Sequence, residues 1–78
     1  MPHITVQMFP GRDDRKKRDL SSKLAETVSS VLGVPEEYVS VSILDVPEAE
    51  WDERVYAEFM KNRQCLYKEP GYEVEQHG

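Results

Sequence analysis

The sequence predicts a small α/β protein in which two strands alternate with two helices. Residues 4–8 and residues 39–44 each alternate apolar and polar side chains, as a half-buried strand does. Between them, apolar residues recur at the spacing of one helical face: Leu20, Leu24, Val28, Val31 and Leu32. A long helix between two strands indicates a parallel pair with a right-handed crossover.

The first helix is bounded by turn and capping residues. Pro10-Gly11 ends the first strand, and Asp13 or Asp14 is a suitable N-cap for the helix that follows. Gly33, with Pro35 shortly after it, is typical of a helix C-terminus. We therefore expect the helix to lie between these caps.

A second helix is expected after Pro47. Proline suits the start of a helix, and the acidic side chains of Glu48 and Glu50 favour its positive end. One side of this helix carries large apolar residues: Trp51, Val55, Phe59 and Leu66. Lys68–Gly71 is expected to end it, and residues 72–74 are expected to form a short terminal strand.

The chain is too small to be well stabilised alone. With 78 residues, it buries only about 60% of its unfolded surface. Its single cysteine, Cys65, cannot close an internal disulfide. Two parallel strands with helices on one side also leave open edges and one uncovered sheet face. The sequence therefore predicts a homo-oligomer, most simply a homodimer.

Composition excludes several classes of partner. The net charge of -5 argues against a general nucleic-acid binder. No run reaches the roughly 18 apolar residues of a membrane helix, and no signal-like N-terminus is seen, so we expect a cytoplasmic protein without membrane contact. Residues 12–18 nevertheless hold five basic and two acidic side chains. This basic run is either a solvated first helical turn or a docking patch for an anionic partner.

Most familiar catalytic motifs are missing. The four glycines are scattered and form no phosphate loop, and His3, Cys65 and His77 lack zinc-site spacing. Pro2 is more informative. Met1 is generally removed before a small residue, which would leave the secondary amine of Pro2 free. An α-amino group titrates near 7.7–8.0, and burial in an apolar pocket lowers its pKa, so such an amine could act as a general base.

Three segments resemble the 4-oxalocrotonate tautomerase family: Met1–Ile4 opening a strand, Pro10–Asp13 before a helix, and Val39–Ile43. Trp51 and the ending Lys68–Tyr72 look like its longer-chain branch, which includes the small bacterial phenylpyruvate-type tautomerase. The resemblance covers the whole chain, so we expect one tautomerase-like domain over residues 1–78. It implies a β-α-β fold assembled as dimers or hexamers, Pro2 as the base, and no metal or organic cofactor.

The resemblance also implies substrate-binding residues. Arg12 matches a family arginine that grips a substrate carboxylate; alternatively, it is a solvated charge. Ser40 stands where well-studied hexameric members carry a second arginine, which favours a monocarboxylate with an apolar tail. Trp51 is either an apolar pocket wall or an ordinary core anchor. His3 should point to the opposite face from Pro2 and is left out of the site.

A strand advances roughly 3.3 Å per residue, so Pro2 and Arg12 should lie about 20 Å or more apart in one chain. If both serve one site, Arg12 comes from another subunit. The expected function is keto–enol tautomerisation of small 2-oxo acids such as phenylenolpyruvate. Two alternatives stay open: a non-catalytic dimerisation or interaction module on the same fold, and a dehalogenase- or hydratase-like enzyme in which protonated Pro2 is the acid.

Overall fold

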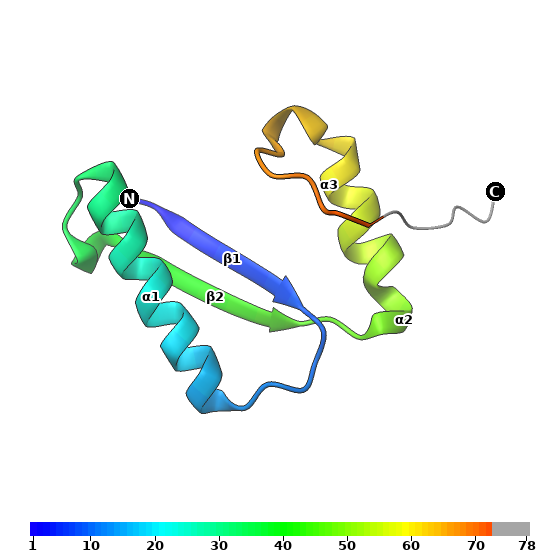
Figure 1. The fold of residues 1–78 in the computed structure, drawn as a ribbon, viewed down its shortest axis with the longest axis horizontal. Helices are drawn as coiled ribbons and strands as arrows, with labels where there is room; N and C mark the ends of the chain where they lie inside the picture. Colours follow the sequence, from blue (N-terminus) through cyan, green and yellow to red (C-terminus); the bar gives the residue numbers. More distant parts are fainter. Residues whose placement is uncertain (73–78) are drawn as a thin grey trace. The chain divides into compact units, whose positions relative to one another are not determined.

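The computed structural model describes residues 1–72 of the chain, in two compact units, one over Met1–Asp45 and one that begins at Val46. The first unit runs β1 (His3–Met8), α1 (Asp14–Leu32), the 3₁₀ turn η1 (Glu36–Tyr38) and β2 (Ser40–Asp45) (Figure 1). The strands are parallel, and the register pairs His3 with Ser40 and Met8 with Asp45. This β-α-β arrangement confirms the predicted fold class.

The ends of α1 follow the predicted capping residues. Asp13 is the N-cap, and its Oδ1 accepts a hydrogen bond of 2.9 Å from the backbone N–H of Lys16. Such a side-chain cap contributes about 1 kcal/mol because it satisfies an N–H that has no partner inside the helix. At the other end, Gly33 has φ 68°, and its N–H donates to the carbonyl of Ser29. Glycine adopts this left-handed conformation without a Cβ clash.

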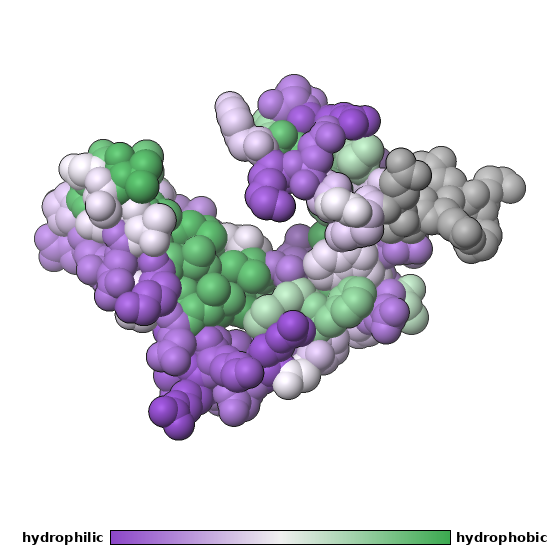
Figure 2. All heavy atoms as spheres, in the orientation of Figure 1, coloured by the Kyte–Doolittle hydropathy of each residue, from purple (hydrophilic) through white to green (hydrophobic). Residues whose placement is uncertain are grey.

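The two faces of the β1–β2 sheet differ in chemistry. One face carries half-buried apolar side chains from both strands and packs against α1 mainly through β2. Figure 2 shows apolar side chains gathered over the strands beside α1. The opposite face carries mostly polar side chains. Its members are His3, Thr5, Gln7, Ser40, Ser42 and Leu44.

The second unit is one interrupted helical segment. It consists of α2 (Glu48–Trp51), the π-helical turn η2 (Asp52–Tyr56) and α3 (Ala57–Lys61), followed by the 3₁₀ turn η3 (Arg63–Cys65). The sequence-based expectation that this helix continues to Leu66 was wrong. Asn62 leaves the helical conformation at φ -111° and ψ 40°, and its side-chain amide donates to the carbonyl of Glu58. In a continuing α-helix the carbonyl of Glu58 would accept from the backbone N–H of Asn62, but here it accepts from the Asn62 side chain. The backbone N–H of Asn62 donates instead to the carbonyl of Phe59.

The expected terminal strand falls largely outside the described residues, which end at Tyr72; Tyr72 itself is not in a strand. Within residues 1–72, only the apolar side chains of Val46 and Val55 are buried, at 0% and 6% exposure. The strands and α1 contain half-buried positions but no fully buried one. Neither unit, over the described residues, therefore has the extensive closely packed core that small domains normally need.

Candidate functional site

Pro2 lies immediately before β1, at the start of the sheet. Its carbonyl accepts a hydrogen bond of 3.2 Å from the backbone N–H of Ser40, so the parallel ladder extends one residue beyond His3. Pro2 is half-buried. The ladder bond fixes the backbone of Pro2 while leaving its ring nitrogen outside the hydrogen-bonding pattern. With Met1 attached, that nitrogen is an amide and not a base.

Ser40 is the first residue of β2 and lies directly beside the start of β1. Its hydroxyl is 2.6 Å from Nδ1 of His3, and Nε2 of the same ring is 3.2 Å from the hydroxyl of Ser42. Parallel pairing places His3 and Ser40 in the same register, so their side chains share the polar face of the sheet. Alternation along β1 puts Pro2 with Ile4 on the other face.

Arg12 lies in the loop between β1 and α1, beyond the far end of β1. Its side chain is exposed, and Nη1 donates to the carbonyl of Phe9 at 3.4 Å. In the part of the chain that the structure describes, Arg12 forms no ion pair. A guanidinium has five N–H groups in a planar fork, so this single long bond leaves donors for a carboxylate. The N-cap at Asp13 fixes the backbone directly after Arg12.

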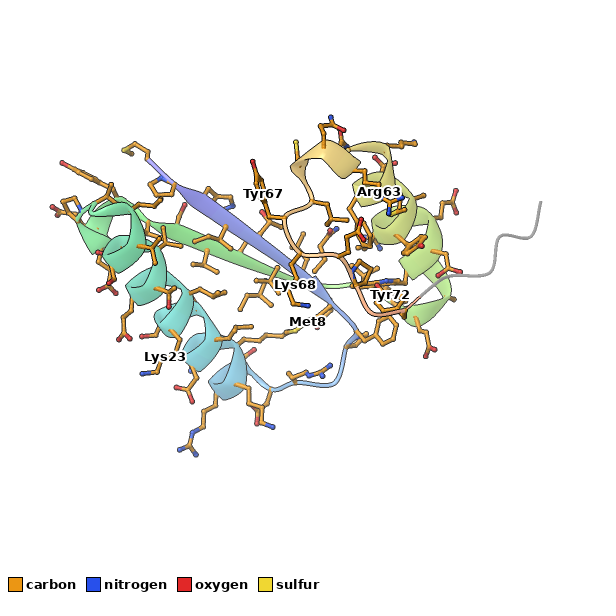
Figure 3. The ribbon with its side chains drawn as sticks, turned by 45° about the horizontal axis from the view of Figure 1, so that its top comes forward. Met8, Lys23, Arg63, Tyr67, Lys68 and Tyr72 are labelled. Carbon is orange, nitrogen blue, oxygen red and sulfur yellow. The ribbon has the colours of Figure 1, made fainter. Side chains whose placement is uncertain are left out.

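Trp51 ends α2 in the second unit, immediately before the π-helical turn. Its indole Nε1–H donates to the hydroxyl of Tyr72 at 3.1 Å. The ring of Tyr56 lies 6.0 Å from that of Tyr72 and 5.1 Å from that of Phe59, the latter edge to face. Tyr72 is labelled in Figure 3. Trp51 is therefore beside a cluster of aromatic rings, which agrees with its reading as a packing residue.

Within the first unit, Pro2, Ser40 and Arg12 of one chain do not come together. Pro2 and Ser40 meet through their backbones at one end of the sheet, but their side chains face opposite sides. Arg12 follows the other end of β1. Six strand residues separate these ends, which corresponds to about 20 Å. An arginine side chain cannot span this distance, so Pro2 and Arg12 of one chain cannot hold the same small molecule.

Sequence reasoning missed two residues that contact the candidates. His3 was set aside because it alternates away from Pro2, but the same alternation aligns it with Ser40 across the ladder. The sequence feature that could have shown this is the polar side chain at every second position of β1, because Thr5 and Gln7 lie on the same face of the strand as His3. Tyr72 was expected in a strand, and nothing in its local sequence predicts its bond to Trp51.

Comparisons with known proteins match the region that contains all four candidate residues. The family model described as tautomerase enzyme matches residues 2–52. The chain belongs to the tautomerase family. A probable tautomerase of Xylella fastidiosa is 40% identical over 73 residues, which cover 92% of this chain and 89% of that relative. A probable tautomerase of Streptococcus pyogenes is 38% identical over 48 residues, covering 62% of this chain and 79% of that relative.

Solved structures of tautomerases have the same fold. The apo structure of an unfused 4-oxalocrotonate tautomerase has a TM-score of 0.61 at 41% identity, over 63% of this chain and 80% of that one. TomN, a 4-oxalocrotonate tautomerase homologue in the tomaymycin biosynthetic pathway, has a TM-score of 0.62 at 29% identity, over 77% and 95%. These likenesses confirm the resemblance to the 4-oxalocrotonate tautomerase family and support tautomerase-type activity in general.

Residues 1–72 contain neither a cluster of metal-ligating side chains nor a helix suited to span a membrane. No group of three or more His, Cys, Asp or Glu side chains in this range is placed to hold a metal ion. No helix in it combines the length and apolar character needed to cross a membrane. Cys65 is exposed and free.

Proposed function

We propose that this tautomerase interconverts the keto and enol forms of small 2-oxo acids, with the amine of Pro2 as general base after removal of Met1. The observation that carries the proposal is the family match, which begins at Pro2 and extends over Arg12, Ser40 and Trp51. The position of Pro2 supports it, because a backbone held in the ladder would fix the direction of a freed amine.

The proton transfer balances without any added group. In the ketonisation direction, the neutral Pro2 amine accepts the proton of the enol hydroxyl. The C–O bond becomes a carbonyl, and the former double-bond carbon takes a proton from the Pro2 ammonium, which returns to the neutral amine. A base of this kind works best when its pKa lies near the working pH. An α-amino group meets this condition better than a lysine does.

The proposed substrate is a monocarboxylate with an apolar tail. Arg12 would hold the carboxylate through two parallel hydrogen bonds, and its exposed guanidinium has donors to spare. Ser40 offers a hydroxyl, which can bind an oxygen but brings no second positive charge. A dicarboxylate would therefore leave one charge without a cationic partner. Trp51 would supply an apolar contact for the tail.

The proposed active form is a homo-oligomer, most simply a homodimer, in which Arg12 comes from a neighbouring subunit. Three observations support this assembly. Pro2 and Arg12 lie at opposite ends of β1, each strand of the sheet has one edge without a partner strand among residues 1–72, and the first unit has no fully buried side chain. A second copy would pair an edge, cover apolar surface and bring its own Arg12 toward Pro2.

The test is the ketonisation of phenylenolpyruvate, followed by ultraviolet absorbance, on protein whose N-terminus is established by mass spectrometry. We expect rapid turnover by the Pro2-initiated chain and none by a form that retains Met1, because an amide nitrogen has no basicity. Pro2→Ala should lower the rate without abolishing it, since a primary amine remains. Equal rates for the processed and the Met1-retaining forms would rule out Pro2 as the base. No turnover by folded, processed protein would favour a non-catalytic module.

A further inference from the structure

The imidazole of His3 is held at both ring nitrogens by serine hydroxyls of the neighbouring strand. Nδ1 lies 2.6 Å from Oγ of Ser40, and Nε2 lies 3.2 Å from Oγ of Ser42. The two serines are two residues apart on β2, so both project from the same face as His3. The ring therefore bridges consecutive positions of that face, and its orientation is fixed by two contacts from one strand.

These contacts determine which atoms Ser40 can offer to a ligand. A serine hydroxyl has one proton to donate and two lone pairs that accept. If Ser40 donates its proton to Nδ1, it has none left for a substrate oxygen. If Nδ1 carries the proton and donates to Ser40, the serine proton is free to point elsewhere. Both the Nδ1–H neutral tautomer and the imidazolium ion produce the second arrangement.

The contact with Ser42 is compatible with the second arrangement. In the Nδ1–H tautomer, Nε2 is an acceptor, and the hydroxyl of Ser42 can donate to it. Both contacts are then satisfied while Ser40 keeps a free proton. The Nε2–H tautomer also satisfies both contacts, but there Ser40 donates to Nδ1, so an anion bound at Ser40 would select the Nδ1–H form. Ser40 is exposed, and its free proton is therefore accessible to an incoming anion.

We infer that His3 is a positioning residue that holds the hydroxyl of Ser40 as a hydrogen-bond donor to the carboxylate of the substrate. The inference rests on the proposed function, because it assigns the Ser40 contact to substrate binding in that reaction. Since the side chains of Ser40 and Pro2 of one chain face opposite sides of the sheet, this Ser40 would serve a site whose Pro2 belongs to a neighbouring chain. His3 acts through Ser40 and does not exchange protons with the reacting carbon. Together the two residues would bind one carboxylate oxygen without a positive charge. Such a contact attracts the second carboxylate of a dicarboxylate less strongly than an arginine would.

Two isosteric variants separate the two contacts of the ring. The amide nitrogen of asparagine occupies nearly the place of Nδ1, so His3→Asn keeps a donor to Ser40 and loses the contact with Ser42. The amide nitrogen of glutamine occupies nearly the place of Nε2, so His3→Gln keeps the contact with Ser42 and loses the donor to Ser40. Ser42→Ala is the matched control for Ser40→Ala, since it removes the other hydroxyl that contacts His3.

The measurement is KM and kcat for phenylenolpyruvate with each variant in its assembled form. We expect Ser40→Ala and His3→Gln each to raise KM about tenfold, because a hydrogen bond to a charged group is lost, with little change in kcat. His3→Asn should stay close to the unmodified protein, and Ser42→Ala should have a small effect. The double variant Ser40→Ala/His3→Gln should be no weaker than either single variant.

The tautomer of His3 can be read without turnover, by ¹⁵N NMR of the imidazole with the keto acid phenylpyruvate as the probe. The signal is assigned by its loss in His3→Asn. We expect a protonated Nδ1 when phenylpyruvate is bound, and this result supports the inference even if turnover of the enol fails. An Nδ1 that stays an acceptor would overturn it. So would equal KM values for His3→Asn and His3→Gln, or additive losses in the double variant.

Discussion

The separation of Pro2 and Arg12 along β1 leads to a quantitative test by subunit mixing. The six residues of β1 lie between them, a span of about 20 Å, so a site that uses both must draw them from two chains. We pair Arg12→Ala, which lacks the carboxylate-binding side chain, with Pro2→Leu. Leucine at position 2 is too large for removal of Met1, so the nitrogen of residue 2 stays an amide and this variant has no free amine at that position. Each variant alone should be nearly inactive.

Mixed oligomers should regain activity in a fixed proportion. When equal amounts of the two chains assemble at random, half of the sites have an intact Pro2. Half of those receive an intact Arg12 from the neighbouring chain, so about one quarter of the unmodified activity should return. The same proportion holds for dimers and hexamers, because each site needs one chain of each kind.

The assay is ketonisation of phenylenolpyruvate after the two variants are unfolded and refolded together. The control is each variant refolded alone, and the mixed sample is compared with the sum of these two rates. Size-exclusion chromatography verifies that the mixed sample has assembled. Activity no higher than the sum of the separate variants, in a sample shown to contain mixed oligomers, would refute the shared site.

Two further predictions concern stability and local packing. Asp13→Ala should lower the free energy of unfolding by about 1 kcal/mol, which lowers the thermal midpoint by about 4–8 °C at fixed protein concentration. Asp14→Ala is the control and should have a smaller effect; equal losses would show that the Asp13 cap is not the cause. Tyr72→Phe removes the hydroxyl that accepts from the indole of Trp51 and should change its fluorescence. Tyr67→Phe, at a side chain 98% exposed, should leave it unchanged, and equal spectra for both variants would contradict the bond.

The first unit was predictable because its signals are local. Alternation identified both strands, with β2 displaced by one residue to Ser40–Asp45, and the capping chemistry of Asp13 and Gly33 identified the ends of α1. The contact between His3 and Ser40 was not predicted. Alternation shows which residues of one strand share a face. It does not show which residue of β2 lies beside His3, because that register depends on how α1 and its loops connect the two strands.

The second unit was less predictable, because its deviations come from single hydrogen bonds. An amide side chain at Asn62 ends the helix early, although apolar spacing continues to Leu66. The spacing of Trp51, Val55 and Phe59 describes a regular helix. A π-helical turn is a rare, single-turn interruption of an α-helix, and the apolar spacing gave no sign of it. The assignment of Pro2 came from the chemistry of a free N-terminal amine together with family resemblance, and those of Arg12 and Ser40 came from the resemblance. All three remain predictions.

The π-helical turn at Asp52–Tyr56 is geometrically an α-helix with one additional residue, since Ala57 bonds back five residues to Asp52. In a regular helix Trp51 and Tyr56, five positions apart, would point about 140° away from each other. The additional residue instead lets both side chains meet Tyr72. A one-residue deletion within this turn would therefore restore a regular α-helix in which Trp51 and Tyr56, then four positions apart, lie about 40° from each other on one side. The pairing of these two rings would survive such a shortening, whereas a regular helix of the present length would separate them.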